Sequence, residues 1–315
     1  MASEPILTGF DLRVAKRTSF WVSQIWLDFL ALTKPEINLL IVVTTFAGFY
    51  LGRASAWHNF PLLRSINAVL GTLLVASGTG ALNQYIERRF DAKMRRTARR
   101  PLAAGRLKPS AVLWFGIVLS VLGSVYLAAA VNRLATLLAL GTLLSYLFVY
   151  TPLKRKSPLC TLVGVIPGAM PPLIGWAAAS GRLSFEAWTV SSALLLWQFP
   201  HFMSIAWMYR EDYARAGFLV LPHDDRAWER FVNWQTLLPL MLLAPVSLLP
   251  AVTGKSDFAY SVAAVLLWDG FLSCGIQFVL RKSSSSARRL LRASIIYVPA
   301  LFGLMIILRA GSGGL

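Results

Sequence analysis

Long runs of apolar residues alternate with short polar segments along almost the whole chain. Crossing a lipid bilayer as a helix takes about 17 to 25 apolar residues. Nine runs reach that length, at 36–52, 65–87, 109–130, 132–150, 158–179, 186–209, 234–252, 258–280 and 292–310. Since no strand-like alternation of apolar and polar positions is present, the pattern favours helices over a membrane β-barrel. The predicted fold class is all-α, a polytopic membrane protein with about nine transmembrane helices.

The composition supports this prediction and the charge distribution orients it. The chain is 56% hydrophobic and 14% charged, with a net charge of +17 that raises the possibility of a nucleic-acid partner. However, 25 of the 31 Lys and Arg residues lie in the odd-numbered segments that flank and connect the predicted spans. Basic loops stay on the cytoplasmic side. We therefore expect a lipid bilayer and no nucleic acid as partner, a cytoplasmic N-terminus and a C-terminus on the outside.

The chain divides into a short N-terminal segment, 1–31, and one membrane domain, 32–312. The segment contains several bulky apolar residues that favour a helix lying on the membrane surface. These are Phe20, Trp21, Ile25, Trp26 and Phe29. A partly disordered tail followed by a packed helix is the alternative. At the start of the first span, Thr33 and Glu36 have the spacing of a capping box, which predicts a structural role for Glu36.

Asn83, Glu87 and Asp91 recur every four residues where the second apolar run ends in a basic cluster. On one helix this spacing places the three side chains within an arc of about 80°. Ionisable groups at a membrane boundary are costly and indicate a functional site. Two interpretations follow. The oxygens could bind Mg²⁺ and a diphosphate beside the basic residues, or the carboxylates could pair with nearby arginines at a solvated helix end.

A second polar pattern occupies 197–212. If one helix continues through this segment, His201 and Asp212 lie within about 20° of each other on one face. Asp212 would then lie at the cytoplasmic mouth, and His201 would lie deeper in the membrane. A buried histidine needs a partner, which could be a neighbouring helix or a chemical role.

Four segments together carry a family resemblance. They are NQYIERRFDAKMRRTARRPL at 83–102, YTPLKRKSP at 150–158, PGAMPPLIGWAA at 167–178 and WQFPHFMSIAWMYREDYARAGFLVLP at 197–222. On these motifs the chain resembles the UbiA-type intramembrane prenyltransferases over roughly residues 30–310. Within that family it is most similar to the branch that attaches a farnesyl group to haem.

The resemblance implies a helical bundle with a central cavity and Mg²⁺-bound diphosphate near its cytoplasmic mouth. It implies farnesyl diphosphate and haem b as substrates, joined at a haem vinyl group to give haem O. The residues that match the catalytic and Mg²⁺-binding positions are Asn83, Glu87, Asp91 and Asp212. Those that match diphosphate contacts are Lys93, Arg96, Arg100, Lys154 and Arg155, and His201 matches a haem-facing position.

The resemblance also implies an inner-membrane bacterial enzyme whose product passes to a haem A synthase or a terminal oxidase. Two other functions stay open. One is prenyl transfer to a quinone or another aromatic acceptor. The other is a secondary transporter, which usually has charges near the bilayer midplane. The acidic residues here gather at one predicted membrane boundary, which favours a diphosphate that enters from that side.

Overall fold

The computed structural model describes residues 24–53, 60–222, 225–254 and 256–311, and within these ranges its regular elements are all helical. The elements are α2 (Pro35–Leu51), α3 (Leu62–Asp91), α4 (Pro109–Ala130), α5 (Arg133–Leu144), η1 (Ser145–Tyr150), α6 (Thr151–Leu153), α7 (Cys160–Gly168), α8 (Met170–Ser180), α9 (Phe185–Met208), α10 (Arg210–Ala216), α11 (Asp225–Val252), α12 (Phe258–Arg281) and α13 (Ser284–Gly311). A shorter helix at 24–32 precedes α2.

Each of the nine predicted runs coincides with a helix or with two consecutive helices. Seven helical stretches in the described part are long and apolar enough to cross a membrane, and α2 with the helix at 24–32 makes an eighth, bent candidate. The predicted span at 186–209 corresponds to α9, which has 24 residues and several polar side chains along its length. Large apolar side chains on the outer face of α4, among them Trp114 and Val125, are exposed, as lipid contact requires. The chain is an integral membrane protein.

Two predicted spans are interrupted. The run at 132–150 begins as α5 and continues as the π-helix η1. The run at 158–179 is divided at Ala169 into α7 and α8. Pro171 and Pro172 follow this break, and a proline fits the first turn of a new helix because the amide N–H that it lacks would have no intrahelical partner there.

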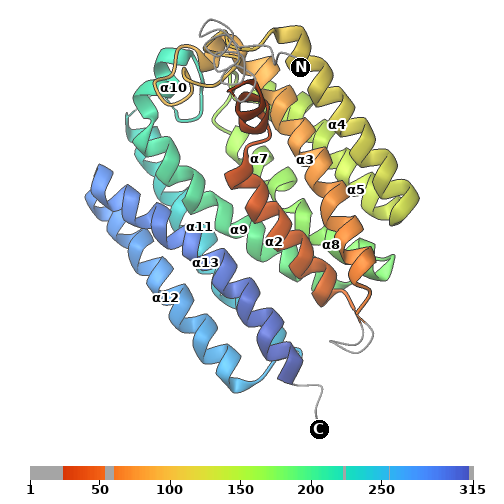
Figure 1. Ribbon diagram of the computed structural model, residues 1–315. Helices are drawn as coiled ribbons and strands as arrows, with labels where there is room; N and C mark the ends of the chain where they lie inside the picture. Colours follow the sequence, from red (N-terminus) through yellow and green to blue (C-terminus); the bar gives the residue numbers. More distant parts are fainter. Residues whose placement is uncertain (1–23, 54–59, 223–224, 255, 312–315) are drawn as a thin grey trace, which may run out of the picture.

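The long helices run side by side in one bundle, with α2 against α8, α3 against α4, and α9 between α11 and α13 (Figure 1). Close approach of α2 to α8 depends on two glycines. A Cβ on Gly48 would collide with the backbone of Pro172, and one on Gly175 would collide with the backbone of Thr45. Small residues at such contacts let two helix backbones pack tightly. The close contact holds the second half of α2 against α8.

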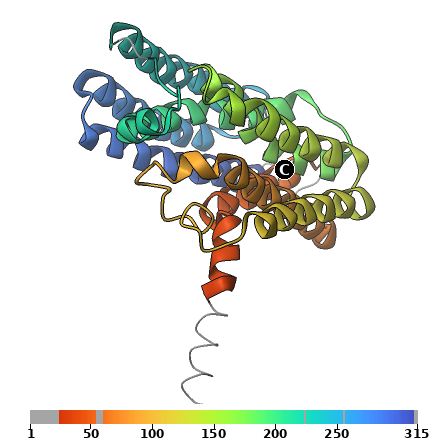
Figure 2. The same cartoon turned by 90° about the horizontal axis from the view of Figure 1, so that it is seen from above.

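The helix at 24–32 projects sideways from the bundle (Figure 2) and meets α2 at an angle of 49°. Trp26 is 71% exposed on it, while Asp28 is buried and accepts two hydrogen bonds from Arg106, each of 2.9 Å. Two residues of the predicted surface helix, Phe20 and Trp21, lie outside the described residues. Membrane-surface binding by this segment therefore stays a prediction.

The predicted capping box is wrong. Thr33 Oγ1 donates a hydrogen bond of 2.7 Å to the carbonyl of Leu30, so it caps the preceding helix end instead of α2. The N-cap of α2 is Lys34, whose side chain makes no cap hydrogen bond and whose backbone is left-handed, with φ of 54°. Such a φ costs a residue with a side chain about 1 to 3 kcal/mol, and it is found where the surroundings need it.

Candidate active site

The polar face of α3 is buried. Asn83, Glu87 and Asp91 are 1%, 5% and 3% exposed, although they occupy the last turns of a helix that ends in a basic segment. Burial of two carboxylates requires cations nearby, because an unpaired charge is strongly disfavoured in the interior. The sequence placed the three residues on one face, and the structure brings a cation to each of them.

Three cations from separate parts of the chain hold this face. Lys34 Nζ donates to Asn83 Oδ1 at 3.0 Å, and Lys154 Nζ donates to both carboxylate oxygens of Glu87 at 2.9 and 3.2 Å. Arg100 Nη1 donates to Asp91 Oδ2 at 2.7 Å. We call these three pairs the cation row: Lys34 with Asn83, Lys154 with Glu87, and Arg100 with Asp91.

Within the cation row, Lys154 is held in its charged form by its neighbours. It lies just beyond α6, and its ammonium group sits 4.6 Å from the centre of the Tyr150 ring. Burial acts to lower the pKa of Lys154, but Glu87 and the neighbouring tyrosines Tyr150 and Tyr146 raise it well above its usual range. The group is therefore a fixed positive charge at physiological pH.

Two members of the site were missed by sequence reasoning, Lys34 and Thr151. Asn83 Nδ2 donates to Thr151 Oγ1 at 3.2 Å, and the Thr151 hydroxyl donates to the carbonyl of Tyr146 at 2.8 Å. That carbonyl belongs to η1, and π-helical turns are frequent at functional sites. Thr151 is part of the YTPLKRKSP motif, and Lys34 precedes the proline that begins α2. Both features are visible in the sequence, but the spacing of polar residues does not show that they lie beside Asn83.

Asp212 is placed differently from the prediction. α9 ends at Met208, and the backbone bends at Tyr209 before α10 begins, so His201 and Asp212 do not share one helix face. Asp212 Oδ2 accepts the backbone N–H of Arg96 at 3.1 Å, and its Oδ1 accepts from Arg215 at 3.0 Å. Burial acts to raise the pKa of Asp212, but these hydrogen bonds and the charge of Arg215 lower it overall. The carboxylate thus braces the basic segment that follows α3.

The remaining predicted diphosphate residues lie at the rim. Lys93, Arg96 and Arg155 are exposed. The guanidinium group of Arg96 lies 5.1 Å from the centre of the Tyr209 ring, and that of Arg155 lies 5.0 Å from the centre of the Phe90 ring. Cation–π contacts of this kind orient a cation without neutralising it. These side chains stay predicted contacts of an incoming anion, outside the buried cation row.

His201 lies about 10 Å along α9 from the helix end at Met208. Its Nδ1 is 2.8 Å from Ser294 Oγ of α13, and its ring stacks on Trp197 at 4.8 Å between ring centres. A hydrogen bond to a neighbouring helix was one of the two interpretations of this residue, and the structure confirms it. The haem-facing role stays a prediction.

The oxygen atoms of Asn83, Glu87 and Asp91 on α3 are suitable ligands for a hard divalent cation that also binds a substrate. Among the described residues no three His, Cys, Asp or Glu side chains cluster closely enough to form a metal site by themselves. Mg²⁺ does not need such a cage, since it is usually bound by one or two carboxylates together with waters and substrate phosphates. Glu87 and Asp91 offer two carboxylates and Asn83 an amide oxygen at the mouth of the bundle. These residues would hold the ion.

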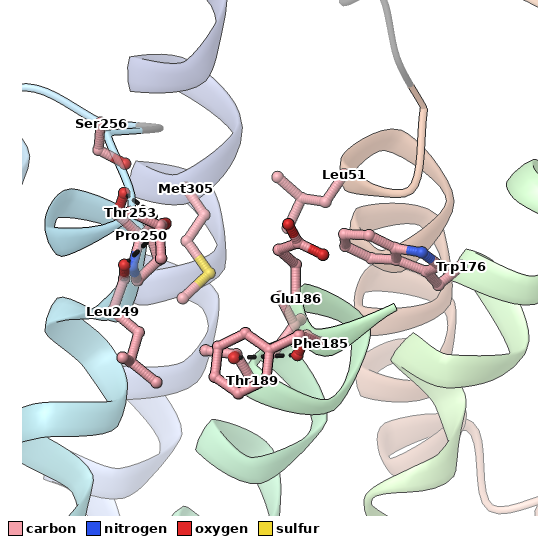
Figure 3. A pocket seen from close by; sticks show the side chains of 11 residues that line it. Leu51, Trp176, Phe185, Glu186, Thr189, Leu249, Pro250, Thr253, Ser256 and Met305 are labelled. Atoms are coloured by element: carbon pink, nitrogen blue, oxygen red, sulfur yellow. Dashed lines mark hydrogen bonds between the residues drawn. The ribbon is translucent and has the colours of Figure 1, made fainter. Parts of the chain in front are cut away.

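A small cavity lies at the opposite end of the bundle, between the end of α2 and the beginning of α9 (Figure 3). Its volume is ≈ 50 Å³, and Trp176, Phe185, Glu186 and Met305 contribute to its lining. A space of this size admits a few water molecules and neither of the expected substrates. The cation row, which contains the predicted site residues of α3, is the candidate site for a charged substrate.

Comparison with known proteins shows which family this chain is similar to. The model of the UbiA prenyltransferase family matches residues 41–298. The Protoheme IX farnesyltransferase of Solibacter usitatus is 48% identical over 290 residues, covering 90% of this chain and 99% of that protein. The one of Salinibacter ruber is 42% identical over 280 residues, covering 89% and 98%.

A solved structure shares the fold. The UbiA homologue of Archaeoglobus fulgidus, determined with GPP and Mg²⁺, superposes with a TM-score of 0.59 at 16% identity, covering 88% of this chain and 99% of that one. At this identity the likeness concerns the fold alone.

Proposed function

The chain belongs to the UbiA prenyltransferase family, and we propose that it transfers the farnesyl group of farnesyl diphosphate to a vinyl group of haem b. The products are haem O and diphosphate. The cation row supports this reaction type, because it brings half-buried basic side chains and oxygen ligands together at one end of an apolar bundle. Relatives that carry the name Protoheme IX farnesyltransferase support haem b as the acceptor.

The reaction requires the bond between farnesyl C1 and the diphosphate oxygen to break, with both electrons leaving on diphosphate. Charge therefore accumulates on the leaving oxygens, and fixed cations stabilise it. Lys34, Lys154 and Arg100 fill this role by exchanging their present partners on α3 for diphosphate oxygens. Mg²⁺, bound at Asn83, Glu87 and Asp91, would add charge neutralisation at the same oxygens.

The acceptor half of the reaction takes place in the apolar part of the bundle. The haem vinyl group attacks farnesyl C1 with its π electrons, a carbon–carbon bond forms, and water adds to the remaining cationic carbon with loss of a proton. Bulk water must be kept from the allylic cation until the vinyl group has reacted. Tyr146 and Tyr150, whose ring centres are 5.1 Å apart, contribute apolar surface beside Lys154.

The cellular setting follows from the same proposal. Residues 32–312 form the prenyltransferase domain in the bacterial inner membrane, with 1–31 in the cytoplasm and the C-terminus outside. The cation row then faces the cytoplasm, where soluble farnesyl diphosphate is available. Haem O is more apolar than haem b, so its transfer to a haem A synthase or a terminal oxidase would take place within the membrane.

Expression in a bacterial host that lacks haem O synthase tests the function. Extracted haems are separated by chromatography, and the expected result is a haem O peak that the empty vector does not give. Protein that is present and folded in the membrane without haem O would contradict the proposal. Analysis of quinones from the same cells tests the alternative acceptor, since a newly prenylated quinone would indicate that reaction instead.

A further inference from the structure

An ion pair joins the short helix at 24–32 to the basic segment 92–108. Arg106 donates from Nε to Asp28 Oδ2 and from Nη2 to Asp28 Oδ1, each at 2.9 Å. The Asp28 side chain is 6% exposed and that of Arg106 is 41% exposed. Two N–H···O bonds of this kind fix the direction of a guanidinium group as well as its distance. Neither residue belongs to the cation row, so the pair needs an explanation of its own.

The same guanidinium group also holds the backbone beside Arg100. Arg106 Nη1 donates to the carbonyl of Arg99 at 3.2 Å. Arg100 is the next residue along the chain, and its own guanidinium group donates to Asp91 at 2.7 Å. Through Arg106, Asp28 therefore determines where the backbone of Arg100 lies relative to α3.

The last turn of the short helix holds Lys34. The carbonyl of Leu32 accepts a hydrogen bond from Gln84 Nε2 of α3 at 3.0 Å, and that of Thr33 accepts one from Asn38 Nδ2 at 2.7 Å. Both bonds fix the chain immediately before Lys34, whose ammonium group reaches α3 from a left-handed backbone. A shift of the short helix would therefore move this ammonium group as well.

Apolar packing attaches the short helix but does not orient it. Leu32 packs with Ala81 of α3 and with Leu102 and Leu107 of the basic segment in one buried cluster. Burial of apolar surface is not directional, whereas a two-bond ion pair is. A partly exposed ion pair also contributes little to stability. The pair is therefore better suited to orienting the two segments than to holding them together.

We infer that Asp28 and Arg106 are positioning residues of the proposed reaction. Their ion pair holds the short helix and the basic segment in the arrangement that lets Lys34 and Arg100 contact the same diphosphate. The inference rests on the proposed function, which supplies the diphosphate. These two basic side chains contact opposite ends of the cation row, about 12 Å apart along α3. Their convergence on one small anion depends on the placement of both segments.

Binding of inorganic diphosphate in the presence of Mg²⁺ tests this role without haem or a farnesyl chain. It is measured by calorimetric titration of the full chain in nanodiscs. Asp28→Asn should weaken binding about 10-fold, the equivalent of one misplaced charge-assisted hydrogen bond. Arg106→Lys should have a similar effect although it keeps the charge, because an ammonium group cannot reproduce the planar fork.

The double variant shows whether the two residues act as a pair. Asp28→Asn combined with Arg106→Lys should bind diphosphate no more weakly than the weaker single variant, because both changes break the same interaction. Wild-type binding in both single variants, or effects that add in the double variant, would overturn the inference.

Glu229→Gln is the matched control. It breaks another ion pair between two elements, the 3.1 Å contact of Glu229 in α11 with Lys282 at the C-cap of α12, and it should bind diphosphate like the wild type. In the farnesyl transfer assay, Asp28→Asn should raise KM for farnesyl diphosphate about 10-fold and leave KM for haem b unchanged. A parallel rise of both KM values, or an equal loss of binding in Glu229→Gln, would indicate general destabilisation and contradict a positioning role.

Two results distinguish failure of this inference from failure of the proposed function. If the wild type makes haem O while both single variants bind diphosphate like the wild type, the function stands and the positioning role is wrong. If the wild type makes no haem O but binds diphosphate, and Asp28→Asn weakens that binding, the positioning role stands and the proposed reaction is wrong.

Discussion

At the scale of single residues, the carboxylates of α3 serve the folded state and the reaction in different ways. Glu87 accepts hydrogen bonds from Lys154, and Asp91 accepts one from Arg100. Each carboxylate therefore holds a basic side chain in place while no substrate is bound. In the proposed reaction, an arriving diphosphate would give the same basic residues a more highly charged partner, and the two carboxylates would become free to bind Mg²⁺. Glu87→Gln and Asp91→Asn should therefore abolish Mg²⁺-dependent farnesyl transfer, measured in membranes with labelled farnesyl diphosphate.

The control for this pair is the amount of protein inserted in the membrane, to which turnover is normalised. The amides keep the shape and a hydrogen-bond acceptor, but some loss of thermal stability is expected because Lys154 or Arg100 loses its charged partner. Turnover close to the wild-type rate in either variant would show that the substituted residue is not a metal ligand.

Lys34 allows a sharper test, because its partner on α3 is uncharged and because burial, together with the charges of Arg100 and Lys154, lowers its pKa to about 7. A bound diphosphate would favour the protonated form. Lys34→Gln removes one charge-assisted hydrogen bond to a substrate anion, worth about 1.5 to 3 kcal/mol. That corresponds to an increase of about 10- to 100-fold in KM for farnesyl diphosphate. Lys108 is a matched control, since it also precedes a proline at a helix start but is exposed and has an extended backbone. Lys108→Gln should leave KM unchanged; equal effects of the two changes would refute a specific role for Lys34.

The candidate site shows what a sequence pattern can and cannot predict at this scale. The i, i+4 spacing of Asn83, Glu87 and Asp91 depends only on helix geometry, so their common face was predictable. The pairing of Asn83 with Lys34 joins residues 49 positions apart and depends on how α2 packs beside α3. Asp212 was predicted to share one helix face with His201, but its bond to the Arg96 backbone depends on a bend at Tyr209 that no periodicity signals.

At the scale of elements, the nine apolar runs were predictable because bilayer thickness fixes their length. Their interruptions were not. The bend at Tyr209 and the break at Ala169 satisfy the packing of neighbouring helices: Ser191 Oγ, for example, donates to the Ala169 carbonyl at 2.8 Å. The capping box failed for a similar reason, because Thr33 is used to end one helix while Lys34 turns toward α3.

The close contact of α2 with α8 is a further element-scale prediction. Gly175→Ala would drive a methyl group into the backbone of Thr45, which cannot move without shifting α2. Overpacking of this kind typically costs about 1 to 3 kcal/mol. We expect a lower temperature of thermal unfolding and a loss of activity, since the start of α2 carries Lys34. The test is thermal unfolding of purified protein in detergent, followed by the farnesyl transfer assay.

Gly141→Ala is the control for that change. Gly141 lies inside α5, and nothing lies within 4 Å of the position of an added Cβ. Alanine favours a helix interior over glycine by about 1 kcal/mol. This variant should be as stable as the wild type or slightly more stable. If Gly175→Ala behaves the same way, the contact between α2 and α8 is more yielding than its geometry implies.

At the scale of the whole molecule, the basic residues and the candidate site coincide at one end of the bundle. The segments 92–108, 154–159 and 209–222 meet there (Figure 1). The small cavity that Leu51 and Glu186 line is at the other end (Figure 3). One charge distribution can thus serve two purposes, since loops rich in Lys and Arg are retained in the cytoplasm and also attract a diphosphate. A substrate made in the cytoplasm would then reach the site without crossing the membrane.

This coincidence predicts the orientation. A fluorescent protein that folds only in the cytoplasm should be bright when inserted at Gly105 or Gly217, two turn glycines with positive φ at the site end. Alkaline phosphatase, which is active only outside, should be active when fused after residue 311. The reciprocal fusions should be silent, and farnesyl transfer by the C-terminal fusion should confirm that the membrane domain is intact. The opposite pattern would place the cation row outside, away from its substrate, and would refute both the orientation and the route of entry.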